Sequence, residues 1–359
     1  MSLQSFWFVA LAAMWAVFLF LEGFDFGVGM LHDFVGRAED EKRVAINAIG
    51  PVWDGNEVWL IVAGAGTFAA FPQWYATMFS GFYIALVLAL AALIIRGVSF
   101  EFRSQSLNSR ARRIWDGTLT LGSFLVPLLI GVALANLLRG TPIASDREFT
   151  GNFVDLLNAY SLFVGVTIVL LCLVHGATFL GLKTDGAVRE RAHGLARWLS
   201  LLAALAVVAY GVWTIVMSGQ AARAWVPIVA MAGAAAAVVL VWRRREGLAF
   251  VATSVAMIAS VATIFVELYP RVMVSSTSTA NDLTISNASS ASYSLTVMTV
   301  VAGIFLPLII IYQGWVYYVF RRRVGKPGGR QGAGGGESPD TGEGAGGEST
   351  GTAGAYTGG

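Results

Sequence analysis

Two carboxylic acids stand inside the first apolar stretch of the chain. Glu22 and Asp25 are three residues apart, so on a helix they share one face about 60° apart. An ionised side chain near the bilayer centre costs about 2.5–3.5 kcal/mol, and Asp25 lies roughly 9 Å inside the apolar stretch. Gly23 and Gly27 in the same turn have a spacing that lets another backbone approach closely. We therefore expect this face to pack against protein, with the acids lining a polar seam.

A second acid pair opens the next apolar stretch. Asp54 and Glu57 are again three residues apart, at the start of a predicted helix where the helix dipole favours negative charge. Pro51 suits the first turn of that helix, and Trp53 and Trp59 suit a membrane interface. Four acids therefore lie in the same half of two consecutive spans.

Carboxyl groups spaced inward from one face of a membrane are what a proton path needs. The alternative is structural: the acids cap helix ends and pair with a loop arginine or with a partner chain. The choice stays open for Glu22, Asp25, Asp54 and Glu57, because spacing indicates an intramembrane acidic site and not a reaction.

Other candidate groups carry weaker signals. His32 and His193 fall near span ends, and only His175 lies inside a span. A haem iron commonly takes a histidine ligand, but a single span histidine more often bonds to a neighbouring helix. Asp116 and Glu267 stand at span ends, where acids commonly pair.

Composition places these residues in a membrane protein. Of 359 residues, 56% are hydrophobic and 13% charged, and mean hydropathy is +0.67. A soluble domain is about 25% charged, so a soluble enzyme is excluded. The net charge of +2 gives no argument for nucleic acid. The single cysteine, Cys172, excludes an internal disulfide and a multi-cysteine metal site. We find no nucleotide-binding or zinc motif, and assign no metal.

The apolar pattern predicts an all-α integral membrane protein with nine transmembrane helices. The second stretch is short and begins with charged groups. The nine stretches are Phe6–Met30, Glu57–Phe71, Tyr75–Ile95, Ile114–Leu138, Ala159–Leu182, Trp198–Met217, Trp225–Trp242, Gly247–Tyr269 and Tyr293–Phe320.

Basic residues in the connections predict the orientation. Twenty of the 24 Lys and Arg fall in connections on one side, with 96–113 among them. Such an excess marks the cytoplasmic side, which places the N-terminus outside and the C-terminus in the cytoplasm. Residues 1–324 are the predicted membrane domain. The remainder, 325–359, is Gly-rich, with 14 glycines after residue 325, and is predicted to be a disordered cytoplasmic tail.

Five segments together resemble subunit II of the cytochrome bd-type quinol oxidases. The resemblance covers about residues 5 to 324, in order and with the same number of spans. The second segment is the most specific. The segments are Glu22–Leu31, Gly50–Leu60, Phe79–Tyr83, Gly151–Phe153 and Ser289–Thr299.

The resemblance implies a fold and a set of partners. Members of the family fold as two four-helix bundles plus one peripheral helix and pair with a homologous subunit I. That partner carries haems b and d and the quinol site, in the bacterial plasma membrane. Small single-span accessory subunits often join, and some members bind a structural quinone in subunit II. The implied function is that of a haem-free subunit of an oxidase that reduces O2 to water with cytoplasmic protons.

The resemblance also implies roles for the acids. The first-helix motif of members with a proton path maps onto Glu22 and Asp25, and the second motif maps onto Asp54. Glu22 stands where some relatives have Asp, and Glu57 where Gln is found. Two other classes of function remain as alternatives: a proton-coupled membrane transporter, and a scaffold whose acids only pair with a partner.

Overall fold

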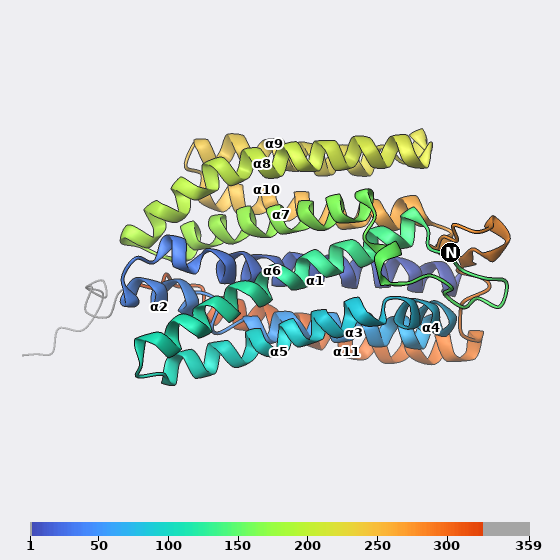
Figure 1. Ribbon diagram of the computed structural model, residues 1–359, viewed down its shortest axis with the longest axis horizontal. Helices are drawn as coiled ribbons and strands as arrows, with labels where there is room; N and C mark the ends of the chain where they lie inside the picture. The colour runs from blue at the N-terminus through green and yellow to red at the C-terminus, as the bar shows by residue number, and fades with distance from the viewer. Residues whose placement is uncertain (1, 326–359) are drawn as a thin grey trace, which may run out of the picture. The chain divides into compact units, whose positions relative to one another are not determined.

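The computed structural model describes residues 2–325, and almost all of its regular structure is helical (Figure 1). The predicted tail lies outside the described residues apart from Gly325. The helices are α1 (Leu3–Val35), α2 (Glu39–Asn47), α3 (Trp53–Ala70), α4 (Pro72–Gly81), α5 (Tyr83–Gln105), α6 (Ser109–Arg139), α7 (Ala159–Lys183), α8 (Gly186–Ser218), α9 (Trp225–Trp242), α10 (Glu246–Leu268) and α11 (Ser292–Val319). Short 3-10 turns cover Phe153–Leu156, Ala221–Arg223 and Thr279–Asn281, and strands β1 (Arg271–Met273) and β2 (Leu283–Thr284) pair antiparallel.

Among the described residues, eight helices are long and apolar enough to cross a membrane: α1 and α5 to α11. The all-α membrane class is therefore confirmed. The remaining predicted span corresponds to α3, whose first turns contain Asp54, Asn56 and Glu57. These polar residues lower its hydropathy, and its crossing of the membrane stays a prediction.

The third predicted span differs from the prediction. Residues 72–74, predicted to be a connection, form the start of α4, and Phe82 separates the end of α4 from the start of α5. Close packing surrounds this junction. Phe82 is fully buried edge-on against Phe149, and a Cβ at Gly81 would lie 2.6 Å from the same ring. Pro51 also differs, because it lies in the turn before α3 and not in its first turn.

Helix α1 runs through the middle of the molecule (Figure 1). Helices α7 to α10 pack together on one side of it, and α3, α5 and α11 lie on the other. The connection at 140–158 and the β1–β2 hairpin lie at the end that contains the N-terminus, and α2 lies at the opposite end. The alternation matches the predicted topology, while the assignment of the ends to the two sides of a membrane stays a prediction.

The expected close approach at the glycines is confirmed, but on a different face from the acids. A Cβ at Gly27 would lie 2.0 Å from the carbonyl oxygen of Cys172 on α7, and Gly176 of α7 packs against Gly27 in return. At 100° per residue the glycines lie about 150° around the helix from Glu22 and Asp25. Helix α1 is therefore held by α7 on its glycine face and is free to present its acids to α3 and α5.

Candidate functional site

The first acid pair is fully buried and is paired with an arginine. Glu22 and Asp25 have no exposed surface. The Arg96 guanidinium, on α5, lies 2.6 Å from Oε1 of Glu22 and is itself fully buried. This contact is an ion pair at close range, although the N–H group is not aligned for a hydrogen bond. The expectation that this face packs against protein is confirmed.

Aromatic rings surround the Arg96 guanidinium. Its central carbon lies 4.9 Å from the ring centre of Phe26, 5.2 Å from that of Phe100 and 6.0 Å from that of Trp53. Rings at such distances attract a cation through their quadrupoles. A Cβ at Gly122 of α6 would lie 2.9 Å from the Cβ of Arg96, so α6 closes the remaining side. The arginine is thus held between the acids and an aromatic wall.

Asn56 connects three helices beside the acids. Its amide group donates to Oδ2 of Asp25 at 2.6 Å and to the carbonyl oxygen of Leu21 at 3.4 Å. Its side-chain oxygen accepts from Gln313 at 2.9 Å and from Tyr317 at 2.8 Å, both on α11. Because every polar atom of this buried amide is bonded, its orientation is fixed and Asp25 is held on α1 relative to α3 and α11.

Of the second acid pair, Glu57 lies beside Arg96 and Asp54 lies at the surface. Oε2 of Glu57 lies 3.5 Å from Arg96, and the side chain is 22% exposed. Asp54, one turn earlier in α3, is exposed. The structure therefore brings Glu22, Asp25 and Glu57 together around one arginine and leaves Asp54 outside, with exposure rising from the α1 acids to Asp54.

Sequence reasoning missed the partners of the acids. The sequence predicts that Arg96 belongs to the connection 96–113, but it lies within α5 and is buried, so this prediction is wrong. Asn56, Gln313 and Tyr317 were not singled out. One feature of the sequence could have indicated Arg96. It follows directly after an apolar stretch, at the same depth as the two acids of the first span. Nothing in the spacing could show that α11 returns to α3.

The charges of the cluster do not balance within the chain. Three acids face one arginine, and Oε2 of Glu22 and Oδ1 of Asp25 are buried without a hydrogen bond from any residue in 2–325. A buried carboxylate without a partner is costly. The arrangement can lower that cost by binding protons, and this is the chemistry it offers.

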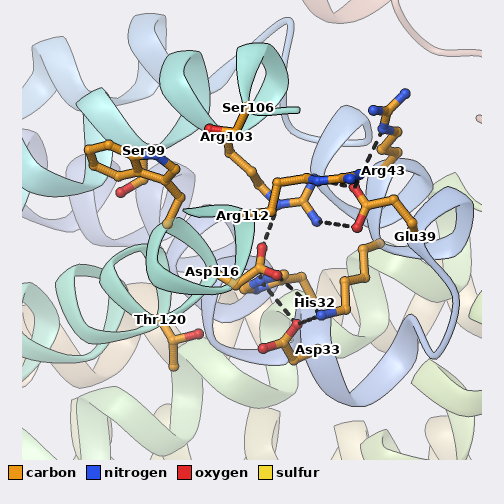
Figure 2. Close-up of polar contacts among 12 residues, drawn as sticks. His32, Asp33, Glu39, Arg43, Ser99, Arg103, Ser106, Arg112, Asp116 and Thr120 are labelled. Atoms are coloured by element: carbon orange, nitrogen blue, oxygen red, sulfur yellow. Dashed lines mark hydrogen bonds and ion pairs between the residues drawn. The ribbon is translucent and has the colours of Figure 1, made fainter. Parts of the chain in front are cut away.

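A second polar cluster joins helices at the end of the molecule where α2 lies. Figure 2 shows the carboxylate of Asp116 on α6 facing His32 of α1 and Arg103 of α5. Asp116 is almost fully buried, Nε2 of His32 lies 3.3 Å from it, and Arg103 also reaches Glu39 of α2 at 3.0 Å. Four helices are thereby tied together. Asp116 lies seven residues inside α6 and not at its end, so the prediction of a helix-end acid was wrong. The prediction that Glu267 pairs was also wrong, since both of its carboxylate oxygens are buried without a hydrogen bond from any residue in 2–325.

His32, Asp33 and Asp116 approach one another closely enough to suggest a metal site. The ammonium group of Lys42, however, lies 2.5 Å from Asp33 and 3.1 Å from Asp116. Partial burial lowers the pKa of Lys42, but its bonds to Asp33 and Asp116 outweigh this effect and raise the pKa above its ordinary value. The Lys42 ammonium group thus contacts both carboxylates, and Arg103 also pairs with Asp116. Cations of the chain already occupy these acids, so the residues do not fit a metal ion.

His175 is bonded to neighbouring helices. It is fully buried, with Nδ1 2.7 Å from the hydroxyl of Thr253 and Nε2 3.2 Å from the carbonyl oxygen of Phe20. Its ring stacks on Phe250 at 4.5 Å. Both ring nitrogens are engaged, so the residue does not fit a haem axial ligand.

Comparisons with known proteins agree on one family. The sequence model of the family described as cytochrome bd terminal oxidase subunit II matches residues 3–320. The chain is 43% identical over 329 residues to the cytochrome bd ubiquinol oxidase subunit 2 of Bacillus subtilis (strain 168), covering 90% of this chain and 97% of that protein. It is 35% identical over 364 residues to the cytochrome bd-I ubiquinol oxidase subunit 2 of Escherichia coli (strain K12), covering 90% and 96%.

A solved structure shares the fold. The bd oxidase of Geobacillus thermodenitrificans contains a chain that matches with a TM-score of 0.73 at 20% identity, covering 89% of this chain and 99% of that one.

Proposed function

This chain belongs to the family of subunit II of the cytochrome bd terminal oxidases, and from that premise we propose that it is the haem-free subunit of a quinol:oxygen oxidoreductase. Its partner is a subunit I that carries haems b and d and oxidises the quinol, and single-span accessory subunits join the pair. The complex lies in the bacterial plasma membrane. The engagement of both ring nitrogens of His175 supports a haem-free role. The family does not favour the transporter alternative.

The topology belongs to the same proposal. Residues 1–324 form a domain of nine spans, with α3 among them, the N-terminus outside and the C-terminus in the cytoplasm. The packing of α7 to α10 on one side of α1, and of α3, α5 and α6 on the other, supports two four-helix bundles. Helix α11, with Leu295 as its one buried residue, is then the peripheral helix.

The chain contributes carboxyl groups to proton delivery for the reduction of O2 to water. The observation that carries this proposal is the gradient of exposure across the four acids. Asp54 is exposed and Glu57 is 22% exposed, whereas Glu22 and Asp25 are fully buried. Protons taken up at Asp54 pass inward past Glu57, and the buried pair holds them beside Arg96. The acids serve as proton carriers.

Substitution of the acids tests this role. We expect Asp25→Asn and Glu22→Gln to slow oxygen consumption with quinol in the purified complex while its visible haem spectrum is unchanged. Asp33→Asn, an exposed acid on the same helix outside the cluster, is the matched control. Full activity of both cluster variants would refute proton delivery through this chain and leave the scaffold alternative, since assembly would be intact.

A further inference from the structure

A long groove lies beside the acid cluster, and Arg96 is not among the residues that line it. It has a volume of about 1100 Å³ and is bounded by α1, α3, α7, α10, α11 and the connection between α2 and α3. Most of its lining is apolar, with Phe24 of α1, Phe179 of α7 and Phe250 of α10 among the rings that form it. Pockets for small ligands are commonly about 300–1,000 Å³. The groove therefore has room for a large apolar molecule.

The length of the groove matches one leaflet of a bilayer. On α11 its lining runs from Ile310 to Phe320, which at 1.5 Å per residue is about 15 Å. The hydrocarbon core of a bilayer is about 30 Å thick. On the proposed topology the groove therefore extends from about the middle of the membrane to one interface, the interface near which α2 lies.

The end of the groove at that interface is basic. Of the described residues that line the groove, none is Asp or Glu, and four carry positive charge: Lys183, Arg321, Arg322 and Arg323. We call these four residues the basic rim. Within residues 2–325, Arg323 alone of the four forms ion pairs, with Asp185 at 3.0 Å and Glu246 at 3.4 Å.

The other three rim cations keep unused hydrogen-bond donors. Lys183 donates to the carbonyl oxygens of Phe320 and Arg322, and Arg321 donates to the carbonyl oxygen of Tyr318 and lies 3.9 Å over its ring. Carbonyl oxygens and a ring leave these positive charges uncompensated. An anion with several acceptor oxygens fits the rim, because arginine and lysine bind phosphate through such donors.

We infer that this groove binds an anionic phospholipid, with its phosphate at the basic rim and an acyl chain along the apolar groove. A neutral quinone fits less well. The side chains of Gln313 and Tyr317, polar groups deeper in the groove, already donate to Asn56, whereas the free donors lie at the rim. The lipid is a permanent part of the subunit and not a substrate.

The bound lipid stabilises the acid cluster through residues of α11. Gln313 and Tyr317 line the groove with one side and hold Asn56 with their polar groups, and Asn56 donates to Asp25. An acyl chain against α11 keeps these two residues in place. This consequence for activity rests on the proposed function, whereas the binding itself does not.

Glycines of α11 offer a matched pair of variants. Gly314 lines the groove, and a Cβ added there meets nothing within 4 Å. Gly303 also has open space but does not line the groove. Gly314→Phe therefore places a ring in the groove from a position where the added Cβ has open space, and Gly303→Phe makes the same change elsewhere on the helix.

The experiment measures lipid retained by the purified oxidase complex. The complex is exchanged extensively into detergent, and the phospholipids that remain are identified and counted by mass spectrometry. We expect the wild type and Gly303→Phe to retain about one anionic phospholipid more than Gly314→Phe. The double variant Arg321→Gln/Arg322→Gln is expected to bind phosphatidylglycerol about 30-fold more weakly, since each basic residue near an anionic surface contributes roughly fivefold. Arg110→Gln/Arg113→Gln, exposed on α6, is its control.

Other outcomes overturn the inference. Equal lipid content in Gly314→Phe and Gly303→Phe would show that the groove holds no lipid. A quinone or a zwitterionic lipid lost from Gly314→Phe in place of an anionic one would show that the occupant was assigned wrongly. Lipid content and oxygen consumption are separate readouts. Lipid lost from Gly314→Phe in a complex whose activity is unaffected by Asp25→Asn would support the lipid site and refute the proton role.

Discussion

The ion pair between Arg96 and Glu22 should be the most sensitive point of the membrane domain. Both side chains are fully buried, and their charged atoms are 2.6 Å apart. Removing one partner of a buried pair costs about 3–5 kcal/mol, because the other charge is left without compensation. Since 1 kcal/mol shifts the unfolding midpoint of a chain of this size by roughly 2 °C, we expect Arg96→Met to lower it by about 6–10 °C.

A second substitution separates the lost charge from the lost packing. In Arg96→Met/Glu22→Gln no full charge of the pair remains, so the double variant should regain about half of the stability lost in Arg96→Met, about 1.5–2.5 kcal/mol. The midpoint is measured as the loss of the monodisperse size-exclusion peak of the purified complex on heating. Arg110→Met, an exposed arginine on α6, is the control and should shift the midpoint by less than 1 °C, since surface changes are worth about 0.5 kcal/mol or less.

Two results would refute this reasoning. If Arg96→Met were as stable as Arg110→Met, the buried pair would contribute nothing. If the double variant lost the sum of the two single losses, the charges would not be coupled, and the cost would come from packing against the aromatic wall.

Three further predictions concern the helices around the cluster. Asp116→Asn should lower the unfolding midpoint by several degrees, because the side chain loses its negative charge and one of the two oxygens that accept from His32, Arg103 and Lys42. Asp33→Asn, at a side chain that is 41% exposed, should have little effect; equal effects would contradict the network. Gly27→Leu should abolish assembly of the complex, since even a Cβ would lie 2.0 Å from a backbone oxygen of α7; co-purification with subunit I checks this, and normal yield would disprove it. His175→Phe should leave the haem spectrum of the complex unchanged, and loss of a haem band would show that the residue is a ligand.

Much of the site could be predicted because burial of charge is visible in a sequence. An acid inside an apolar stretch must face protein, and this reasoning correctly identified Glu22 and Asp25 as buried. It also identified Asp54 and Glu57 as neighbours in the next helix. It did not separate those two, since their different exposure depends on how α3 is rotated against α5, and single-helix spacing contains no information on that rotation.

The sequence by itself determined the class of the protein, most of its long apolar helices and the presence of an acidic site. Each follows from the free energy of transferring residues into a bilayer, which depends on residue type and order alone. Only the tertiary structure decided the partners. Arg96 arrives from α5, Asn56 from α3, and Gln313 and Tyr317 from α11, far along the chain. Periodicity fixes where a side chain points around its own helix axis, but which helix stands opposite is settled by the packing of all the helices together.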